Sequence, residues 1–181
     1  MKKDFGGKNL IVKKYKELGS THKYLKENYK EYQPNTVIIA EKQTDGIGTK
    51  GRKWFTGSEK NIAMSILYKP NCKLQNLNGL TIKIANIIQE KIKYLYDINL
   101  KIKEPNDLML NNKKICGILT EINTIGDKIN YLIISIGFNV NEMGFPEELE
   151  SIATSLKKEM NKELNKEELT QQFINSLENI F

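Results

Sequence analysis

The chain has 181 residues, 39% of them hydrophobic and 28% charged, a composition typical of a soluble globular protein with one domain. No apolar run approaches the ~20 residues of a membrane-spanning helix, and the N-terminal segment lacks the apolar block of a signal peptide. The formal net charge is +6, but the lysines are spread along the whole chain, which favours a protein that handles anions over one that binds nucleic acid.

The first predicted element is a strand over 10–18, followed by a helix that Ser20 caps and that extends toward Pro34. The apolar run 36–40 predicts a buried strand. Residues 43–53 contain three glycines and show no hydrophobic periodicity, so we expect a loop there.

The clearest helix is predicted over 75–96, where apolar residues recur at spacings of three and four. Asn165 can cap a last helix whose apolar residues repeat up to Phe181. Asn111 and Asn112 predict the tight turn of a hairpin. The remaining strands are expected over 61–68, 100–102, 108–110, 115–122 and 129–140. Successive hairpin strands with few helices indicate an α+β fold, a mixed β-sheet packed with helices, and not a doubly wound α/β fold.

One arginine and one tryptophan stand out in a chain whose other basic residues are all lysine. Arg52 is the single arginine among 28 basic residues, and Trp54 is the only tryptophan. Arginine differs from lysine in its planar fork of donors, which binds phosphate in two places and stacks on rings. The neighbourhood of Arg52 is therefore the first candidate for a site.

The same neighbourhood contains a glycine loop with the pattern G-x-G-x-x-G, formed by Gly46, Gly48 and Gly51. A dinucleotide fold requires this pattern directly after a strand and at the start of a helix, and neither condition is met. Glycines still allow backbone N–H groups to form an anion-binding nest. Lys50, Arg52 and Lys53 add positive charge, and Trp54 offers a flat face to a base. The alternative is a flexible surface loop.

The two cysteines, Cys72 and Cys116, do not have the spacing of a metal or redox motif. We interpret them as reduced thiols of a cytoplasmic protein, with Cys116 a small core residue. His22, the only histidine, is expected on the surface at the start of a helix, and it gives little support to a Ser-His-Asp triad.

Several segments together resemble the biotin–protein ligase family. Residues 43–54 resemble its glycine-rich biotin and adenylate loop. Four further segments follow the family's order, namely Ser20-Thr21-His22, Lys103-Glu104-Pro105-Asn106-Asp107, 113–121 and 136–141, and 153–156 is also similar. The resemblance covers residue 10 to the end. It implies the α+β catalytic domain that these ligases share with class II aminoacyl-tRNA synthetases.

The resemblance implies that residues 1–181 form a single catalytic domain, without an N-terminal helix-turn-helix or a C-terminal β-domain. It implies an enzyme that makes biotinyl-5′-AMP from biotin and ATP with Mg²⁺. Biotin then passes to a lysine of a biotin carboxyl carrier domain, with no nucleic-acid or membrane partner. Members of the family often dimerise, so a homodimer is compatible with the resemblance. The alternatives are a lipoate or octanoate ligase or transferase of the same fold, and a non-catalytic relic that binds biotin or nucleotide.

The resemblance also assigns residues to roles. The implied biotin-binding residues are Ser20, Thr21, Gln43, Gly46, Lys114, Gly117 and Leu119. The implied ATP and adenylate residues are Gly48, Lys50, Gly51, Arg52, Trp54, Lys103, Asn106 and Asn139. The implied catalytic residues are Lys114, Lys103, Arg52 and Asp107, with Asp107 also the implied Mg²⁺ ligand. Within these sets, cations would offset the repulsion between the biotin carboxylate and the α-phosphate, while Trp54 and Asn139 would recognise adenine.

The sequence departs from the family's pattern at four positions. Ile47 and Thr49 stand where the loop usually carries cations, which predicts weaker retention of the adenylate. His22 replaces asparagine, and Glu104 replaces tryptophan. Without the resemblance, two explanations that involve no site remain open. Lys114 could belong to a solvated hairpin tip, and 103–107 could be only a proline turn.

Overall fold

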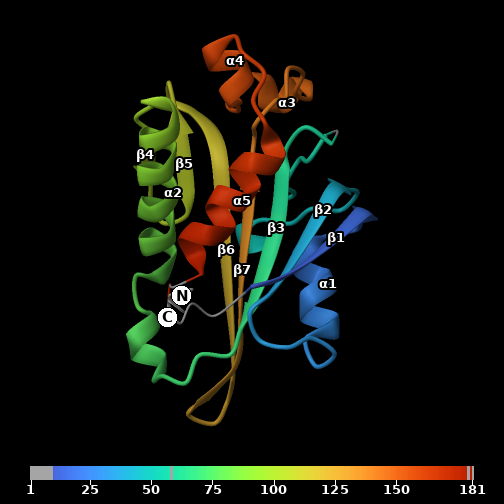
Figure 1. Ribbon diagram of the computed structural model, residues 1–181, viewed down its shortest axis with the longest axis vertical. Helices are drawn as coiled ribbons and strands as arrows, with labels where there is room; N and C mark the ends of the chain where they lie inside the picture. The colour runs from blue at the N-terminus through green and yellow to red at the C-terminus, as the bar shows by residue number, and fades with distance from the viewer. Residues whose placement is uncertain (1–9, 58, 179, 181) are drawn as a thin grey trace, which may run out of the picture.

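The computed structural model describes residues 10–57, 59–178 and 180 (Figure 1). The predictions made for Met1–Gly7 and for Phe181 concern residues outside this set. Among the helices described, none combines the length and the apolar character needed to cross a bilayer.

A seven-stranded sheet forms the centre of the molecule, in the order β1-β2-β3-β7-β6-β5-β4. The strands are β1 (Ile11–Leu18), β2 (Thr36–Gln43), β3 (Ile62–Tyr68), β4 (Lys101–Lys103), β5 (Asp107–Leu110), β6 (Lys113–Ile125) and β7 (Lys128–Phe138). β1 pairs in parallel with β2, and the other neighbours are antiparallel. The sheet is therefore mixed, which confirms the predicted α+β class.

Helices cover the two faces of the sheet unequally (Figure 1). α2 (Leu80–Tyr96) and α5 (Lys166–Leu177) pack together on one face and bury the larger apolar core there. α1 (Thr21–Asn28) covers part of the other face over a smaller apolar cluster. α3 (Glu147–Glu150) and α4 (Leu156–Met160) gather at the end of the molecule opposite the β6–β7 turn.

Side chains along β7 alternate between the two faces of the sheet, and one of these faces contributes to a candidate site. Ile134, Ile136 and Phe138 point into the core beneath α2 and α5. On the opposite face Tyr131 and Ile133 pack under α1. Because side chains alternate along a strand, Ser135 and Gly137 continue this second face. Ser135 lies under the first turn of α1, where it contacts His22, and Gly137 follows it along the strand.

Two predicted helices begin or end elsewhere. α1 ends at Asn28 instead of extending toward Pro34, and the Asn28 side chain donates to the Tyr24 carbonyl oxygen (2.8 Å), in competition with the backbone. α2 begins at Leu80 and not at 75, because Gly79 has a left-handed φ of 74°. The preceding residues form a 3₁₀ turn, η2 (Leu74–Leu77).

The turn chemistry agrees with the sequence prediction. Asn111 and Asn112 have φ values of 49° and 64° and close the β5–β6 hairpin. Asn165 caps α5, where its Oδ1 accepts the backbone N–H of Glu168 (3.0 Å). The short helices α3 and α4 were not predicted, since four or five residues are too few to show a helical period.

Candidate active site

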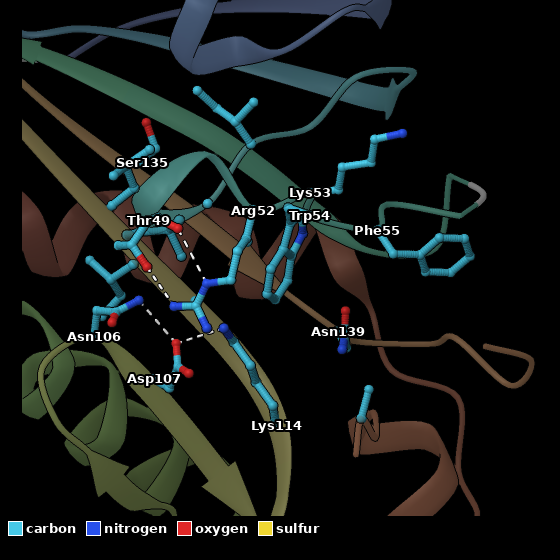
Figure 2. A pocket seen from close by; sticks show the side chains of 18 of the residues that line it. Thr49, Arg52, Lys53, Trp54, Phe55, Asn106, Asp107, Lys114, Ser135 and Asn139 are labelled. Atoms are coloured by element: carbon cyan, nitrogen blue, oxygen red, sulfur yellow. Dashed lines mark hydrogen bonds and ion pairs between the residues drawn. The ribbon is translucent and has the colours of Figure 1, made fainter. Parts of the chain in front are cut away.

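A cavity of about 380 Å³ opens on the α1 face of the sheet, beyond the N-terminus of α1. Most of the predicted site residues line it, although they come from segments far apart in the sequence. These residues are Ser20, Thr21, Gln43, Gly48, Arg52, Trp54, Lys103, Asn106, Asp107, Lys114, Gly117, Leu119 and Asn139. Figure 2 shows several of them around the cavity.

The glycine loop forms one wall as a small hairpin of its own. The Gly48 N–H donates to the Arg52 carbonyl oxygen (2.7 Å), and the Trp54 N–H donates to the Gly46 carbonyl oxygen (2.8 Å). These backbone donors are satisfied within the loop, so the predicted anion nest does not form from them. Side chains such as that of Arg52, which lines the cavity, are therefore the first candidates for binding an anion here.

Three residues of the predicted set do not line the cavity. Lys50 and Gly51 form the exposed tip of the loop, with positive φ values of 58° and 70°. Gly46 is buried, and a Cβ added there would lie 2.6 Å from the Trp54 carbonyl oxygen. Gly46 therefore permits the loop to close, while ligand contacts for these three residues stay predictions.

Arg52 extends over the cavity and is held by its own loop (Figure 2). Its Nη2 donates to the Thr49 hydroxyl (2.9 Å), and its Nε donates to the Thr49 carbonyl oxygen (3.3 Å). A guanidinium has five N–H donors, so others remain for an anion. Thr49 thus orients Arg52, the single arginine of the chain.

A second charged group lies on β5 and β6. Lys114 Nζ lies 2.6 Å from Asp107 Oδ1, and the Asn106 side-chain amide donates to the same oxygen (3.0 Å). The backbone of Lys114 is also fixed, since its N–H donates to the Ile152 carbonyl oxygen (2.7 Å). Lys114 is therefore a fixed residue of the cavity wall and not part of a solvated hairpin tip.

Metal binding by protein groups alone has little support in the described part of the chain. No cluster of three or more His, Cys, Asp or Glu side chains lies within it. Among the residues that the structure describes, Asp107 is the only acidic one that lines the cavity. Mg²⁺ in proteins is commonly held by one or two carboxylates together with substrate phosphates. The residues fit that arrangement, in which Asp107 would be the protein's ligand.

Trp54 rests on two glycines that face each other across neighbouring strands. Gly117 on β6 pairs with Gly137 on β7. A Cβ at Gly117 would lie 2.8 Å from Trp54 Cζ3, and a Cβ at Gly137 would lie 2.3 Å from Trp54 Cε2. The indole ring can therefore lie flat on the sheet only because both residues are glycine. The sequence prediction did not include Gly137, because the pairing of the two glycines depends on strand register.

Two buried polar atoms in this region have no hydrogen-bond partner among the described residues, Trp54 Nε1 and Asn139 Oδ1. The Asn139 amide group donates to the Thr154 carbonyl oxygen (3.0 Å), which fixes its orientation. Buried polar groups are nearly always paired in native proteins. One unpaired donor and one unpaired acceptor therefore indicate a ligand with complementary groups, such as a nucleobase.

The other end of the cavity is polar and is built around α1. The Thr21 N–H donates to Gln43 Oε1 (2.8 Å), and the Gln43 amide donates to the Thr56 hydroxyl (3.0 Å). Ser20 caps α1 by accepting the Lys23 N–H (3.4 Å), which leaves its own hydroxyl proton for another acceptor. Hydroxyl and amide groups of this kind can bind a small polar ring.

The prediction that His22 lies on the surface is wrong, because only 2% of this residue is exposed. Its Nδ1 lies 2.8 Å from Ser135 Oγ, and its Nε2 lies 3.1 Å from Glu121 Oε2. Burial lowers the pKa of His22, and the Glu121 carboxylate offsets this only in part. Burial acts to raise the pKa of Glu121, but hydrogen bonds from His22, Lys26 and Tyr131 outweigh it and lower the pKa. Cys116, as predicted, is fully buried in the core.

Comparison with known proteins places these features in context. The family model described as "Biotin/lipoate A/B protein ligase family" matches residues 16–139. The bifunctional ligase/repressor BirA of Bacillus subtilis is 37% identical over 161 residues, 87% of this chain and 49% of that protein. The biotin–acetyl-CoA-carboxylase ligase of Mycobacterium tuberculosis is 28% identical over 124 residues, 66% of this chain and 44% of that protein. The chain spans about half the length of the curated relatives it matches.

A solved structure is similar over nearly the whole chain. It is that of the biotin protein ligase from Aquifex aeolicus in complex with biotin and ATP, with a TM-score of 0.82 and 29% identity. The similarity covers 94% of this chain and 69% of that chain.

Proposed function

The chain belongs to the biotin/lipoate A/B protein ligase family, and we propose that it is an ATP-dependent biotin–protein ligase. In this proposal the enzyme forms biotinyl-5′-AMP from biotin and ATP. It then transfers biotin to a lysine of a biotin carboxyl carrier domain. The names of the relatives and the complex of the Aquifex protein with biotin and ATP support this choice within the family.

The observation that carries the proposal is the order in which polar groups and the Trp54 ring follow one another along one cavity. Ser135, Gly137 and Asn139 follow one another at two-residue intervals, which places each about 7 Å beyond the last. Ser135 belongs to the polar end, Gly137 seats Trp54, and Asn139 presents the unpaired acceptor. One cavity can therefore hold a polar ring at one end and a base at the other.

Basic side chains line the part of the cavity where the biotin carboxylate and the α-phosphate of ATP would meet. Arg52, Lys103 and Lys114 all line the cavity, and Figure 2 shows the side chains of Arg52 and Lys114 extending into the same part of it. The biotin carboxylate and the α-phosphate are both anions, so their approach is unfavourable unless positive charge offsets the repulsion. Lys114 and Arg52 would supply that charge at fixed positions.

Both steps of the proposed reaction balance without an enzyme nucleophile. The biotin carboxylate attacks the α-phosphorus of ATP, and pyrophosphate leaves. The uncharged ε-amine of the carrier lysine then attacks the carbonyl carbon of the mixed anhydride, AMP leaves, and the amine nitrogen loses one proton to water as the amide forms. Mg²⁺ carried by the phosphates would add to the positive charge, and Asp107 would hold it.

We also propose a cytoplasmic location, since both Cys72 and Cys116 are free thiols. The carrier domain is proposed from the chemistry of transfer and from the family. A homodimer remains compatible with the family.

Biotin-dependent release of pyrophosphate from ATP tests the proposal. The protein is incubated with ATP, Mg²⁺ and one acid at a time, namely biotin, lipoate or octanoate. We expect release with biotin and little with the other two. Release with lipoate alone would favour the lipoate ligase, while binding of biotin without release would favour the non-catalytic relic.

A further inference from the structure

Thr49 occupies one edge of the Arg52 guanidinium with two different oxygens. Its hydroxyl accepts a hydrogen bond from Arg52 Nη2 (2.9 Å), and its carbonyl oxygen accepts one from Arg52 Nε (3.3 Å). Nε and Nη2 carry parallel N–H groups along the same edge of the planar group, so both donors of this edge are used. Figure 2 draws both contacts, and the remaining nitrogen, Nη1, points away from Thr49. Of the five N–H donors of a guanidinium, this leaves two on Nη1 and one on Nη2.

The backbone of the loop also fixes Arg52 relative to Thr49. The Arg52 N–H donates to the Thr49 carbonyl oxygen (3.3 Å), and the Gly48 N–H donates to the Arg52 carbonyl oxygen (2.7 Å). Lys50 and Gly51 lie between the two partners with φ values of 58° and 70°. Two central residues with positive φ are typical of a type I′ turn, which brings its first and fourth residues together. Arg52 is therefore held through its backbone as well as through its side chain.

The positive charge of Arg52 is not neutralised within the described part of the chain. None of the ion pairs found there includes Arg52, and Asp107 on the cavity wall is paired with Lys114 (2.6 Å) instead. Thr49 and Arg52 both line the cavity. The Nη1–Nη2 edge of Arg52 therefore has the paired donors and the charge that bind two oxygens of a phosphate or a carboxylate.

Lysine could not replace Arg52 in this arrangement. An ammonium group is a compact point charge with three donors. If it were held by both oxygens of Thr49, it would keep one donor and no paired edge for an anion. A guanidinium separates the two tasks, because each edge carries its own pair of donors. This difference gives a physical reason why the one arginine among 28 basic residues is at position 52.

We propose that Thr49 is a positioning residue, which occupies the Nε–Nη2 edge of Arg52 so that the Nη1–Nη2 edge binds a pair of phosphate oxygens in the cavity. The identity of the anion rests on the proposed function, in which Arg52 faces the phosphate of ATP. The division of the guanidinium into two edges does not depend on that function. Thr49 thus contributes to phosphate binding without a charge of its own, through the arginine that it orients.

NMR can test the division of the two edges directly, because Arg52 is the only arginine of the chain. The full chain is labelled with ¹⁵N-arginine, and any purification tag is removed, so that the side-chain Nε–H and Nη–H signals belong to Arg52. Spectra at low temperature are recorded with Mg²⁺ and ATP, with pyrophosphate and with biotin, each added alone. We expect ATP and pyrophosphate to shift the Nη–H signals and to leave the Nε–H signal nearly unchanged.

Calorimetry then measures the contribution of the Thr49 hydroxyl to ATP binding. Valine has the shape of threonine without the hydroxyl, whereas serine retains the hydroxyl. We expect Thr49→Val to weaken ATP binding about three- to tenfold and to leave biotin binding nearly unchanged, while Thr49→Ser stays close to wild type. Thr124→Val is the matched control, since Thr124 pairs with Ile129 on the β6–β7 hairpin and does not line the cavity.

A double-mutant cycle separates the role of the hydroxyl toward Arg52 from any general effect on the loop. Arg52→Lys keeps the charge but has no second edge to orient. In this background Thr49→Val should change the affinity for ATP by less than about twofold.

The proposal would be overturned if Thr49→Val had the same effect with lysine at position 52 as with arginine. It would also be overturned if ATP moved the Nε–H signal as far as the Nη–H signals, or if biotin alone moved the Nη–H signals. A protein that binds ATP in this way but releases no pyrophosphate with biotin would contradict the biotin ligase function and still support the role of Thr49.

Discussion

The indole of Trp54 lies so close to Gly137 that a Cβ at position 137 would be 2.3 Å from Trp54 Cε2. Real Cβ atoms do not approach other atoms this closely, so the ring must move if the glycine is replaced. The contact links a loop residue to the middle of the sheet and fixes the ring beside Asn139. It therefore gives a direct way to test whether the seat of Trp54 matters for adenylation.

Gly137→Ala should lower the rate of biotinyl-adenylate formation by about tenfold or more, because small displacements of positioning groups have large effects on rate. Gly144→Ala is the matched control, since a Cβ there would meet nothing within 4 Å. Pyrophosphate release measures both variants. Equal rates for Gly137→Ala and wild type would show that the position of Trp54 is not important for the reaction.

Lys114→Ala should reduce adenylation by about 100-fold while leaving the thermal midpoint nearly unchanged. Lys114 is partly exposed, and its Nζ contacts Asp107 (2.6 Å) at the cavity wall. The control is Lys113→Ala, because Lys113 Nζ donates instead to the Glu150 carbonyl oxygen (3.1 Å). A comparable loss of activity in both variants, or in neither, would remove Lys114 from the proposed chemistry.

Trp54 fluorescence should change when ATP and biotin are added together, because the adenylate would contact the single tryptophan and its unpaired Nε1. Emission is recorded during titration with each substrate alone and with both. Trp54→Phe serves as the blank. An unchanged spectrum at saturating substrate would place the adenine away from Trp54.

Ile47→Arg should slow the release of biotinyl-adenylate by about 10- to 100-fold, since a charge-assisted hydrogen bond contributes ~1.5–3 kcal/mol and Ile47 lines the cavity, whereas the Thr49 hydroxyl is needed to hold Arg52. The wild-type loop has Ile47 and Thr49 where cations are expected, and Lys50 lies at the exposed tip. Stopped-flow release from preformed complexes measures the rate. Indistinguishable release rates would indicate that Lys50 already supplies the contact.

The parts of the fold that were predicted are those encoded locally. The asparagines at 111 and 112, the cap at Asn165 and the stripe of α2 each act within a few residues. The first turn predicted for α2 was wrong because Gly79 adopts a left-handed conformation, which the apolar stripe does not reveal. Propensity and periodicity thus located the elements better than their ends.

The site residues also fall into those that the local sequence predicts and those that depend on contacts distant in the sequence. Residues in contiguous motifs, such as Lys114 and Asp107, were predicted from the sequence and line one cavity. Gly137 was missed because its meaning depends on the register between β6 and β7. His22 was placed on the surface because its sequence neighbours are polar. Its burial depends on Glu121 and Ser135, which lie 99 and 113 positions away in the chain.

The most direct test of the proposed function is mass spectrometry of a biotin carboxyl carrier domain after incubation with the protein, ATP, Mg²⁺ and biotin. We predict a carrier whose mass increases by one biotinyl group on a single lysine, only when ATP is present. Omission of biotin, and replacement of the acceptor lysine of the carrier by arginine, should each abolish the increase. A carrier that remains unmodified by biotin but gains a lipoyl or octanoyl group under the same conditions would contradict the assignment as a biotin–protein ligase.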